Sequence, residues 1–159
     1  MIKFLKLMVI KHVHFYLIGK SSDDELCLRW YQLAALQPFM ISHRGWGQGM
    51  SDPHSVTESE STFEALKSSI QIRYRLLPYL YTVFYNSSQL GEPVVRPLFY
   101  EFPKDKKTYR IDKQYMLGSA LMASPITQPK VNTVESYFPK ENNGSVWLVI
   151  LFIILFVRI

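Results

Sequence analysis

The sequence predicts an α/β fold in which two helices, joined by a buried strand, precede a region of strands alone. Apolar residues recur at helical spacing in two segments between residues 22 and 91, and the apolar run Phe39–Ile41 between them is expected to be the strand. Beyond residue 91 the pattern changes to short extended pieces bounded by prolines. This order is typical of the end of an α/β barrel that runs into a β domain. The 159 residues suffice for one domain, whereas a complete (β/α)8 barrel needs roughly 250.

The first helix is expected to begin near Ser22, since Ser22 and Glu25 have the spacing of a capping box, and to end at Pro38. Side chains at helical spacing give it one mostly apolar face: Leu26, Trp30, Leu33, Ala34 and Gln37. Cys27 is expected to be a small buried side chain. As the only cysteine it excludes an intrachain disulfide and a metal site built on paired thiols, and we expect neither a metal nor a cofactor.

The second helix is the clearest element. Ser61 and Glu64 repeat the capping spacing, Pro78 is expected to kink the helix, and Gly91 is a natural stop. One aromatic face is expected to belong to the core rather than to bind a cofactor: Phe63, Leu66, Ile70, Tyr74, Leu77, Tyr81 and Phe84. The preceding residues 44–62 carry no apolar period and are interpreted as a long loop, a kind of segment that is often functional.

Three pieces after Gly91 are predicted to be extended. Val94–Leu98 follows Pro93 and contains Pro97, which confines it to an edge or irregular strand. The other two, Ala120–Ile126 and Val131–Phe138, are β-like in composition.

The net charge of +5 does not predict a nucleic-acid partner. The two densest basic clusters are small: Lys3, Lys6 and Lys11, and Lys104, Lys106, Lys107 and Arg110. A solvated surface explains them better than a track for phosphates.

Both ends of the chain are apolar. In residues 1–20 the run Leu7–Ile10 is shorter than the apolar core of a signal peptide, which needs about 7–15 residues. Val146–Val157 falls short of the roughly 18–20 residues that span a bilayer. We expect this segment to form a buried strand pair or to be a non-native tail rather than a membrane anchor, and a peripheral hydrophobic contact remains open.

Four blocks of sequence resemble glycoside hydrolase family 31, the α-glucosidases, in that family's order and spacing. They are ELCLRWYQLAALQPF at Glu25–Phe39, RYRLLPYLYTVFY at Arg73–Tyr85, GEPVVRPLFYEFPKD at Gly91–Asp105 and IDKQYMLGSALMASPI at Ile111–Ile126. The resemblance covers about residues 18–147. It is strongest to the neutral α-glucosidases, including the endoplasmic-reticulum glucosidase II that trims N-glycans, with lysosomal and intestinal α-glucosidases next.

The resemblance implies the last part of a (β/α)8 TIM barrel that runs into the start of a β-sandwich domain. The implied divisions are a divergent segment 1–20, the barrel end 21–91, the β domain 92–145 and an apolar tail 146–159. The implied substrates are α-linked glucosides, from which such enzymes hydrolyse terminal glucose with retention. The resemblance also implies a location in the secretory pathway, the endoplasmic reticulum or the lysosome, although the chain shows no clear signal peptide.

Retaining hydrolysis needs two carboxyl groups about 5–5.5 Å apart. The family's two catalytic aspartates lie on earlier barrel strands, upstream of every matched block. The local aspartates are better interpreted as helix caps or as residues outside the barrel: Asp23, Asp24, Asp52, Asp105 and Asp112. We therefore expect no catalytic residue in this chain, and we expect a missing amino-terminal part of the same enzyme to supply the pair. The alternative is a non-catalytic carbohydrate-binding or regulatory fragment.

One family residue carries over to this sequence. The family's pattern Pro-Phe-x-Arg-x-His ends its last barrel strand, and its histidine donates a hydrogen bond to the glucose being cleaved. Here the pattern falls on Pro38–His43, so the resemblance implies that His43 binds substrate, although Ile41 replaces the arginine. Without the resemblance, His43 is equally a loop-edge histidine with no ligand. Trp46 is a candidate for sugar stacking or a loop anchor.

Two triplets fit the N-glycosylation sequon. They begin at Asn86 and Asn143. Because Asn86 lies near the end of an amphipathic helix, we expect it to be exposed.

Overall fold

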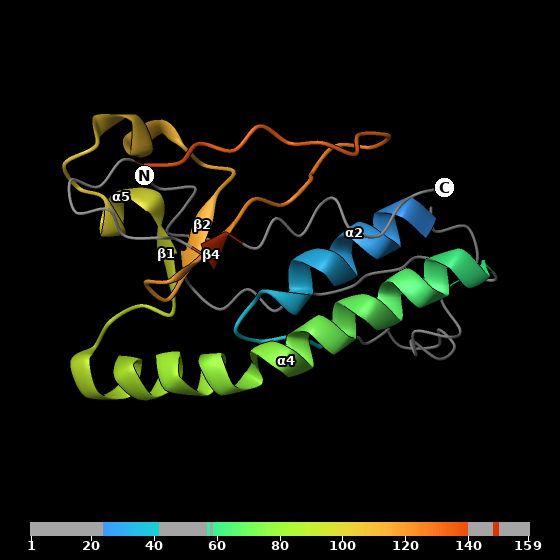
Figure 1. Cartoon of the computed structure of the whole chain (residues 1–159), viewed down its shortest axis with the longest axis horizontal. Helices are drawn as coiled ribbons and strands as arrows, with labels where there is room; N and C mark the ends of the chain where they lie inside the picture. The colour runs from blue at the N-terminus through green and yellow to red at the C-terminus, as the bar shows by residue number, and fades with distance from the viewer. Residues whose placement is uncertain (1–23, 42–56, 58, 140–147, 150–159) are drawn as a thin grey trace, which may run out of the picture.

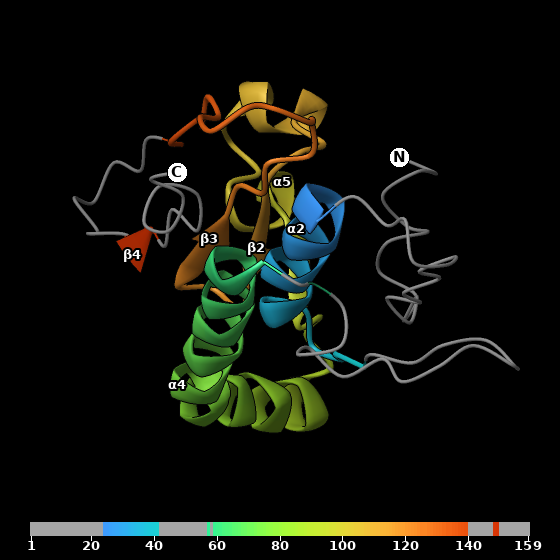
Figure 2. The same ribbon diagram turned by 90° about the vertical axis from the view of Figure 1, so that its right-hand side faces the viewer.

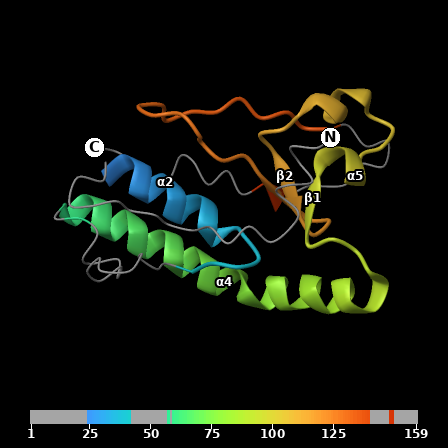
Figure 3. The same cartoon turned by 180° about the vertical axis from the view of Figure 1, so that it is seen from behind.

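The computed structural model describes residues 24–41, 57, 59–139 and 148–149. Two long helices, α2 (Asp24–Ala35) and α4 (Glu60–Leu90), lie side by side, and a small sheet with short helices stands at one end of this pair (Figures 1 and 3). The remaining elements are β1 (Val95–Pro97), α5 (Leu98–Glu101), the 3-10 helix η1 (Lys106–Arg110), β2 (Tyr115–Leu117), β3 (Leu121–Ala123) and β4 (Leu148–Val149).

Helix α2 buries a different face from the one predicted. Its buried side chains are Cys27, Leu28, Tyr31, Ala34 and Ala35. Leu26 and Trp30, which the sequence pattern placed on the apolar face with Leu33, are exposed. Both sets have helical spacing, and the choice between them depends on where α4 packs. The expected burial of Cys27 is confirmed.

Helix α2 ends three residues before Pro38. Two turn hydrogen bonds continue it, from Leu36 N to Leu33 O (3.1 Å) and from Gln37 N to Ala34 O (3.0 Å). The prediction that Phe39–Ile41 is a buried strand is wrong for this chain: Phe39 is 45% exposed and Ile41 40% exposed, and neither lies in a strand. A strand needs a neighbour to pair with, and the described strands pair only among themselves.

Helix α4 begins two residues earlier than its predicted cap. Ser59, in an extended conformation, accepts a hydrogen bond from Thr62 N through its side chain, so Ser59 and not Ser61 is the N-cap. The predicted loop therefore ends before residue 60, and residues 44–56 and 58 lie outside the described part of the chain. The predicted stop is confirmed: Gly91 adopts a left-handed φ of 71° and donates its N–H to Ser87 O.

Helix α4 changes direction partway along its length (Figure 2). Pro78 lies inside the helix, where it lacks an N–H and its ring clashes with the carbonyl four residues earlier. This confirms the predicted kink. The bend also divides the predicted aromatic face. Leu66 is buried and Ile70 packs on the same cluster, whereas the later members are exposed: Tyr74, Leu77, Tyr81 and Phe84. The prediction that this whole face is core is wrong for its second half.

The four strands form one sheet in the order β1-β2-β3-β4. The first three are antiparallel neighbours, and β4 pairs with β3 in parallel. Pro97 stands in β1 at the edge of the sheet, as predicted for a proline-containing strand. The β-like segment Val131–Phe138 forms no strand, and its prediction is wrong. Strand β2 escaped prediction because three residues are too few to show an alternating pattern.

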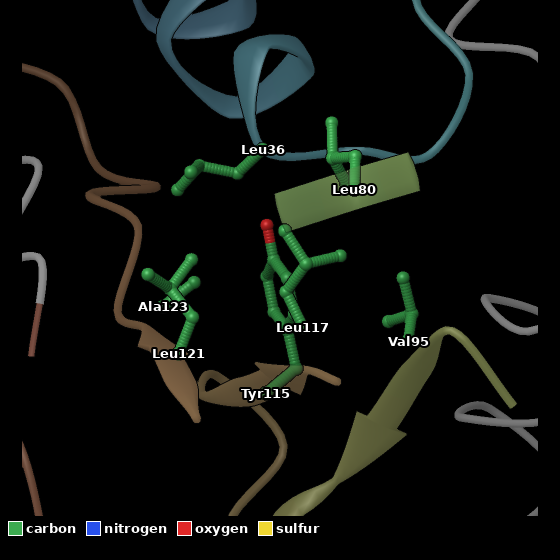
Figure 4. Close-up of a cluster of buried hydrophobic side chains, with 7 residues drawn as sticks. All are labelled: Leu36, Leu80, Val95, Tyr115, Leu117, Leu121 and Ala123. Atoms are coloured by element: carbon green, nitrogen blue, oxygen red, sulfur yellow. The ribbon is translucent and has the colours of Figure 1, made fainter. Parts of the chain in front are cut away.

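A hydrophobic core joins the sheet to the helices. Figure 4 shows Leu36, after α2, and Leu80, from α4, lying over side chains of β1, β2 and β3: Val95, Tyr115, Leu117, Leu121 and Ala123. Gln37 Nε2 donates a hydrogen bond of 3.0 Å to the Tyr115 hydroxyl. Burial raises the pKa of this phenol well above its ordinary value. The end of α2 is therefore fixed against the sheet by both apolar and polar contacts.

Candidate functional site

Three of the four predicted site residues lie outside the described part of the chain: His43, Trp46 and Asn143. The structure describes the chain up to Ile41, two residues before His43. Asn86, the fourth, lies on α4 with an exposed side chain, as predicted.

Arg73 on α4 binds the backbone that leads toward His43. Its Nη1 donates to Ala35 O (3.3 Å) and to Gln37 O (2.5 Å), and its Nη2 donates to Pro38 O (3.0 Å). Burial lowers the pKa of the guanidinium. The sequence resemblance included Arg73 in a matched block but gave it no role. One signal could have identified it: α2 has no basic residue in its last turn, so its free carbonyls need a donor from elsewhere.

The aspartates in the described residues have structural partners. Asp24 accepts a hydrogen bond of 2.5 Å from the Thr57 hydroxyl, which joins the start of α2 to the residues before α4. Asp105 caps η1 by accepting from Lys107 N (3.0 Å), and its other oxygen accepts from the Tyr137 hydroxyl (2.6 Å). That hydrogen bond raises the pKa of the Tyr137 phenol. These partners agree with the interpretation that the local aspartates are not a catalytic pair.

A second group of carboxylates surrounds a buried arginine. Arg96, in β1, forms ion pairs with Glu101 and with Glu92 (2.6 Å), and its Nε donates to Pro93 O (2.7 Å). Its guanidinium also lies 5.3 Å from the centre of the Tyr100 ring. Because both carboxylates neutralise the same buried cation, this cluster holds the edge strand in place.

A polar clamp ties helix α2 to the segment after β3. Glu25 accepts hydrogen bonds from Lys130 N at 2.9 and 3.1 Å, and Arg29 donates to Val131 O at 2.8 Å. Beside this clamp lies a groove of about 410 Å³, mainly apolar, with Trp30, Leu33, Ile126 and Pro129 among its lining residues and polar groups at its rim. The sequence reasoning missed this groove because residues about a hundred positions apart build it.

Two further searches cover only the part of the chain that the structure describes. No helix there is long and apolar enough to cross a membrane. Within the same residues, no three His, Cys, Asp or Glu side chains gather in a way that could hold a metal ion.

Two family models match the chain in succession. The glycosyl hydrolases family 31 TIM-barrel domain matches residues 15–83, and the glycosyl hydrolase family 31 C-terminal domain matches residues 91–150. The first covers α2 and most of α4, and the second covers the sheet. The matches therefore support an α/β barrel region followed by a separate domain, as the sequence predicted.

Relatives and a solved structure agree with these matches. The chain is 42% identical over 123 residues to the lysosomal α-glucosidase of Mus musculus, covering 77% of this chain and 13% of that protein. It is 41% identical over 127 residues to an α-glucosidase of Aspergillus niger, covering 80% of this chain and 13% of that protein. A family 31 dextranase of Flavobacterium johnsoniae, solved with glucose, superposes with a TM-score of 0.68 at 29% identity, over 74% of this chain and 14% of the dextranase.

The chain thus spans about an eighth of the length of the curated relatives it matches. Within that span it carries two adjoining family domains in the family's order, with named α-glucosidases among its relatives. On these grounds the chain belongs to glycosyl hydrolase family 31.

Proposed function

We propose that this chain supplies the closing part of the catalytic barrel of an α-glucosidase that releases terminal α-linked glucose with retention. The observation that carries the proposal is the succession of two family 31 domains in a chain about 40% identical to proteins named α-glucosidases. In finer terms, residues 21–91 are the end of a (β/α)8 barrel and residues 92–145 begin a β-sandwich domain.

Hydrolysis needs an amino-terminal part that carries the paired carboxylates. In a retaining enzyme these groups face each other across the bond at about 5–5.5 Å. Among the described residues, Asp24, Asp105, Glu92 and Glu101 each hold another part of this chain. The chain alone therefore binds glucosides without cleaving them.

The exposed second half of α4 is suited to receive that amino-terminal part. Tyr74, Leu77, Tyr81, Phe84 and Tyr85 recur at steps of three, four and one along the helix, and Tyr81 is 78% exposed. An exposed apolar stripe of this kind usually marks an interface. The first half of the same face is already buried against α2, so the stripe continues a packing surface of the fold.

In the complete site, His43 donates a hydrogen bond to the glucose and Trp46 offers a stacking face. The proposal rests on the family pattern over Pro38–His43 and on the general placement of barrel sites at the carboxyl ends of strands. It makes no use of a metal or cofactor.

The lysosomal name of several relatives supports a location in the secretory pathway. The exposed sequon at Asn86 is compatible with N-glycosylation there. Expression in secreting eukaryotic cells tests this: glycosidase treatment should reduce the mass of the chain, and Asn86→Gln should remove most of that difference.

A chimera tests the catalytic proposal. The aligned 127 residues of the Aspergillus niger α-glucosidase are replaced by the corresponding residues of this chain. The chimera should hydrolyse maltose and an aryl α-glucoside, and the isolated chain should not. His43→Ala should lower kcat/KM strongly, whereas His54→Ala, a histidine from the same stretch of sequence, serves as the matched control. A folded chimera without activity would contradict the proposal, as would robust turnover by the isolated chain.

The second candidate is a non-catalytic carbohydrate-binding fragment, which the groove beside Trp30 favours. An exposed indole in an apolar groove, with Glu25, Arg29 and Gln128 also lining it, combines a stacking face with hydrogen-bonding groups. Titration of the isolated chain with glucose, followed by NMR, distinguishes the two. Shifts confined to Trp30 and its groove would support this candidate, and shifts at His43 would favour the barrel site.

A further inference from the structure

We infer that Arg73 is a positioning residue for the glucose site: it fixes the backbone exit of α2, from which His43 follows within five residues of Pro38. The inference rests on the proposed glucose contact of His43. It assigns a role to a residue on α4 that lies thirty positions beyond His43 in the sequence.

Three carbonyl groups converge on this single side chain. Ala35 is the last residue of α2, whereas Gln37 and Pro38 lie beyond the helix end. The shorter bonds, 2.5 Å and 3.0 Å, go to the two carbonyls beyond the helix, and the longest, 3.3 Å, goes to the helix itself. An arginine that only capped α2 would bind chiefly the carbonyls of its last turn. Arg73 therefore holds mainly the exit segment.

The chemistry of the guanidinium fits this task. It is planar and presents five donors in a fixed fork, so it can hold several carbonyls in one relative orientation. A lysine ammonium in the same place supplies charge but no fork. The free carbonyls at a helix end also favour a cation, and α2 has none of its own in its last turn.

The exit segment has few other constraints. Phe39 and Ile41 are largely exposed, while Met40 packs against the cluster that contains Cys27 and Leu28. The Met40 contact fixes one side chain, and Arg73 fixes the direction of the backbone two residues earlier. Together they determine where the chain leaves α2 on its way to His43.

The test uses the full chain with histidine labelled for NMR and deoxynojirimycin, an aza-sugar, as the probe. Arg73→Lys keeps the charge and removes the fork, and Arg75→Lys, at an exposed position on the same helix, is the matched control. We expect Arg73→Lys to shift the ring signals of His43 and to weaken the binding of the probe by about 10- to 100-fold, because misplacement by about 1 Å has effects of that size. Arg75→Lys should change neither. Amide exchange within α2 should stay close to that of the unmodified chain in both variants.

Retention of the His43 signals and of the affinity in Arg73→Lys would overturn the inference. So would a loss of affinity that merely follows the unfolded fraction measured in urea. If the unmodified chain shows no response to the probe at His43, the proposed glucose contact fails. The positioning role is then decided by the His43 signals and the amide exchange of residues 36–41 alone: unchanged values overturn it, and changed values support it.

Discussion

The turn between β2 and β3 contains a glycine that no other residue should replace. Gly118 has a φ of +60°, and a Cβ added there would lie 2.5 Å from the Tyr79 hydroxyl oxygen and 2.8 Å from Val83 Cγ2. The Tyr79 hydroxyl is itself engaged, because it donates to Leu117 O (2.6 Å) and accepts from Ala120 N (3.3 Å). Gly118→Ala therefore combines backbone strain with the displacement of a side chain that joins α4 to the sheet.

The two contributions can be estimated separately. A left-handed conformation costs a non-glycine residue about 1–2 kcal/mol. Moving the Tyr79 ring breaks two hydrogen bonds at about 0.5–1.5 kcal/mol each, so the total loss of unfolding free energy should be about 2–5 kcal/mol. Gly91→Ala is the matched control: Gly91 has a φ of +71°, but nothing lies within 4 Å of its added Cβ. It should show the backbone contribution alone, about 1–2 kcal/mol.

Pulse proteolysis across a urea gradient, at low protein concentration, measures both variants. With a urea m-value of about 1–3 kcal/mol/M, the midpoint of Gly118→Ala should lie below that of Gly91→Ala by roughly 1 M. Tyr79→Phe removes the hydroxyl that the new Cβ meets, so adding it to Gly118→Ala should cost less than adding it to the unmodified chain. Equal midpoints for the two glycine variants would refute the steric reasoning, and additive effects would show that the hydroxyl is not the obstacle.

Three further predictions concern other parts of the structure. Burial raises the pKa of Tyr115, so the unfolded phenol ionises first; the unfolding free energy should fall as the pH rises above about 10, and Tyr115→Phe should lessen that fall in urea titrations at increasing pH. Buried Gln114 accepts from Tyr137 N (2.8 Å) and donates to Tyr137 O (3.2 Å), so Gln114→Leu should speed amide exchange at Tyr137 by at least tenfold; unchanged exchange would show that other contacts hold this segment. Tyr81→Lys with Phe84→Lys should reduce self-association in analytical ultracentrifugation and change the unfolding free energy by no more than about 0.5 kcal/mol, and an unchanged mass distribution would exclude this face as the contact.

Several local features followed from the sequence because local sterics decide them. Gly91 ends α4, since it adopts a left-handed conformation that other residues avoid. Pro78 bends the same helix, and Pro97 restricts its strand to an edge because it cannot donate to a neighbour. The N-cap was predicted at Ser61 instead of Ser59 because only Ser61 has a glutamate three residues later, while the observed cap uses the backbone of Thr62.

Burial was predicted less well, because periodicity gives the faces of a helix but not what covers them. On α2 the residues against the core are Cys27, Leu28 and Tyr31, while the equally periodic Leu26 and Trp30 line a groove. On α4 one continuous apolar face is half buried and half exposed. The strand Phe39–Ile41 fits a barrel pattern, but it needs neighbouring strands that the described residues do not include.

The sequence by itself determined the family, since four blocks in order suffice to identify it and two domain models match the chain in succession. It also located the kink and the stop of α4, because these depend on single residues and their immediate neighbours. Only the tertiary structure decided that Arg73 binds the exit of α2 and that Glu25 and Arg29 hold Lys130 and Val131. Such contacts join residues between 36 and 105 positions apart, and their existence depends on how helices and strands pack rather than on any local pattern.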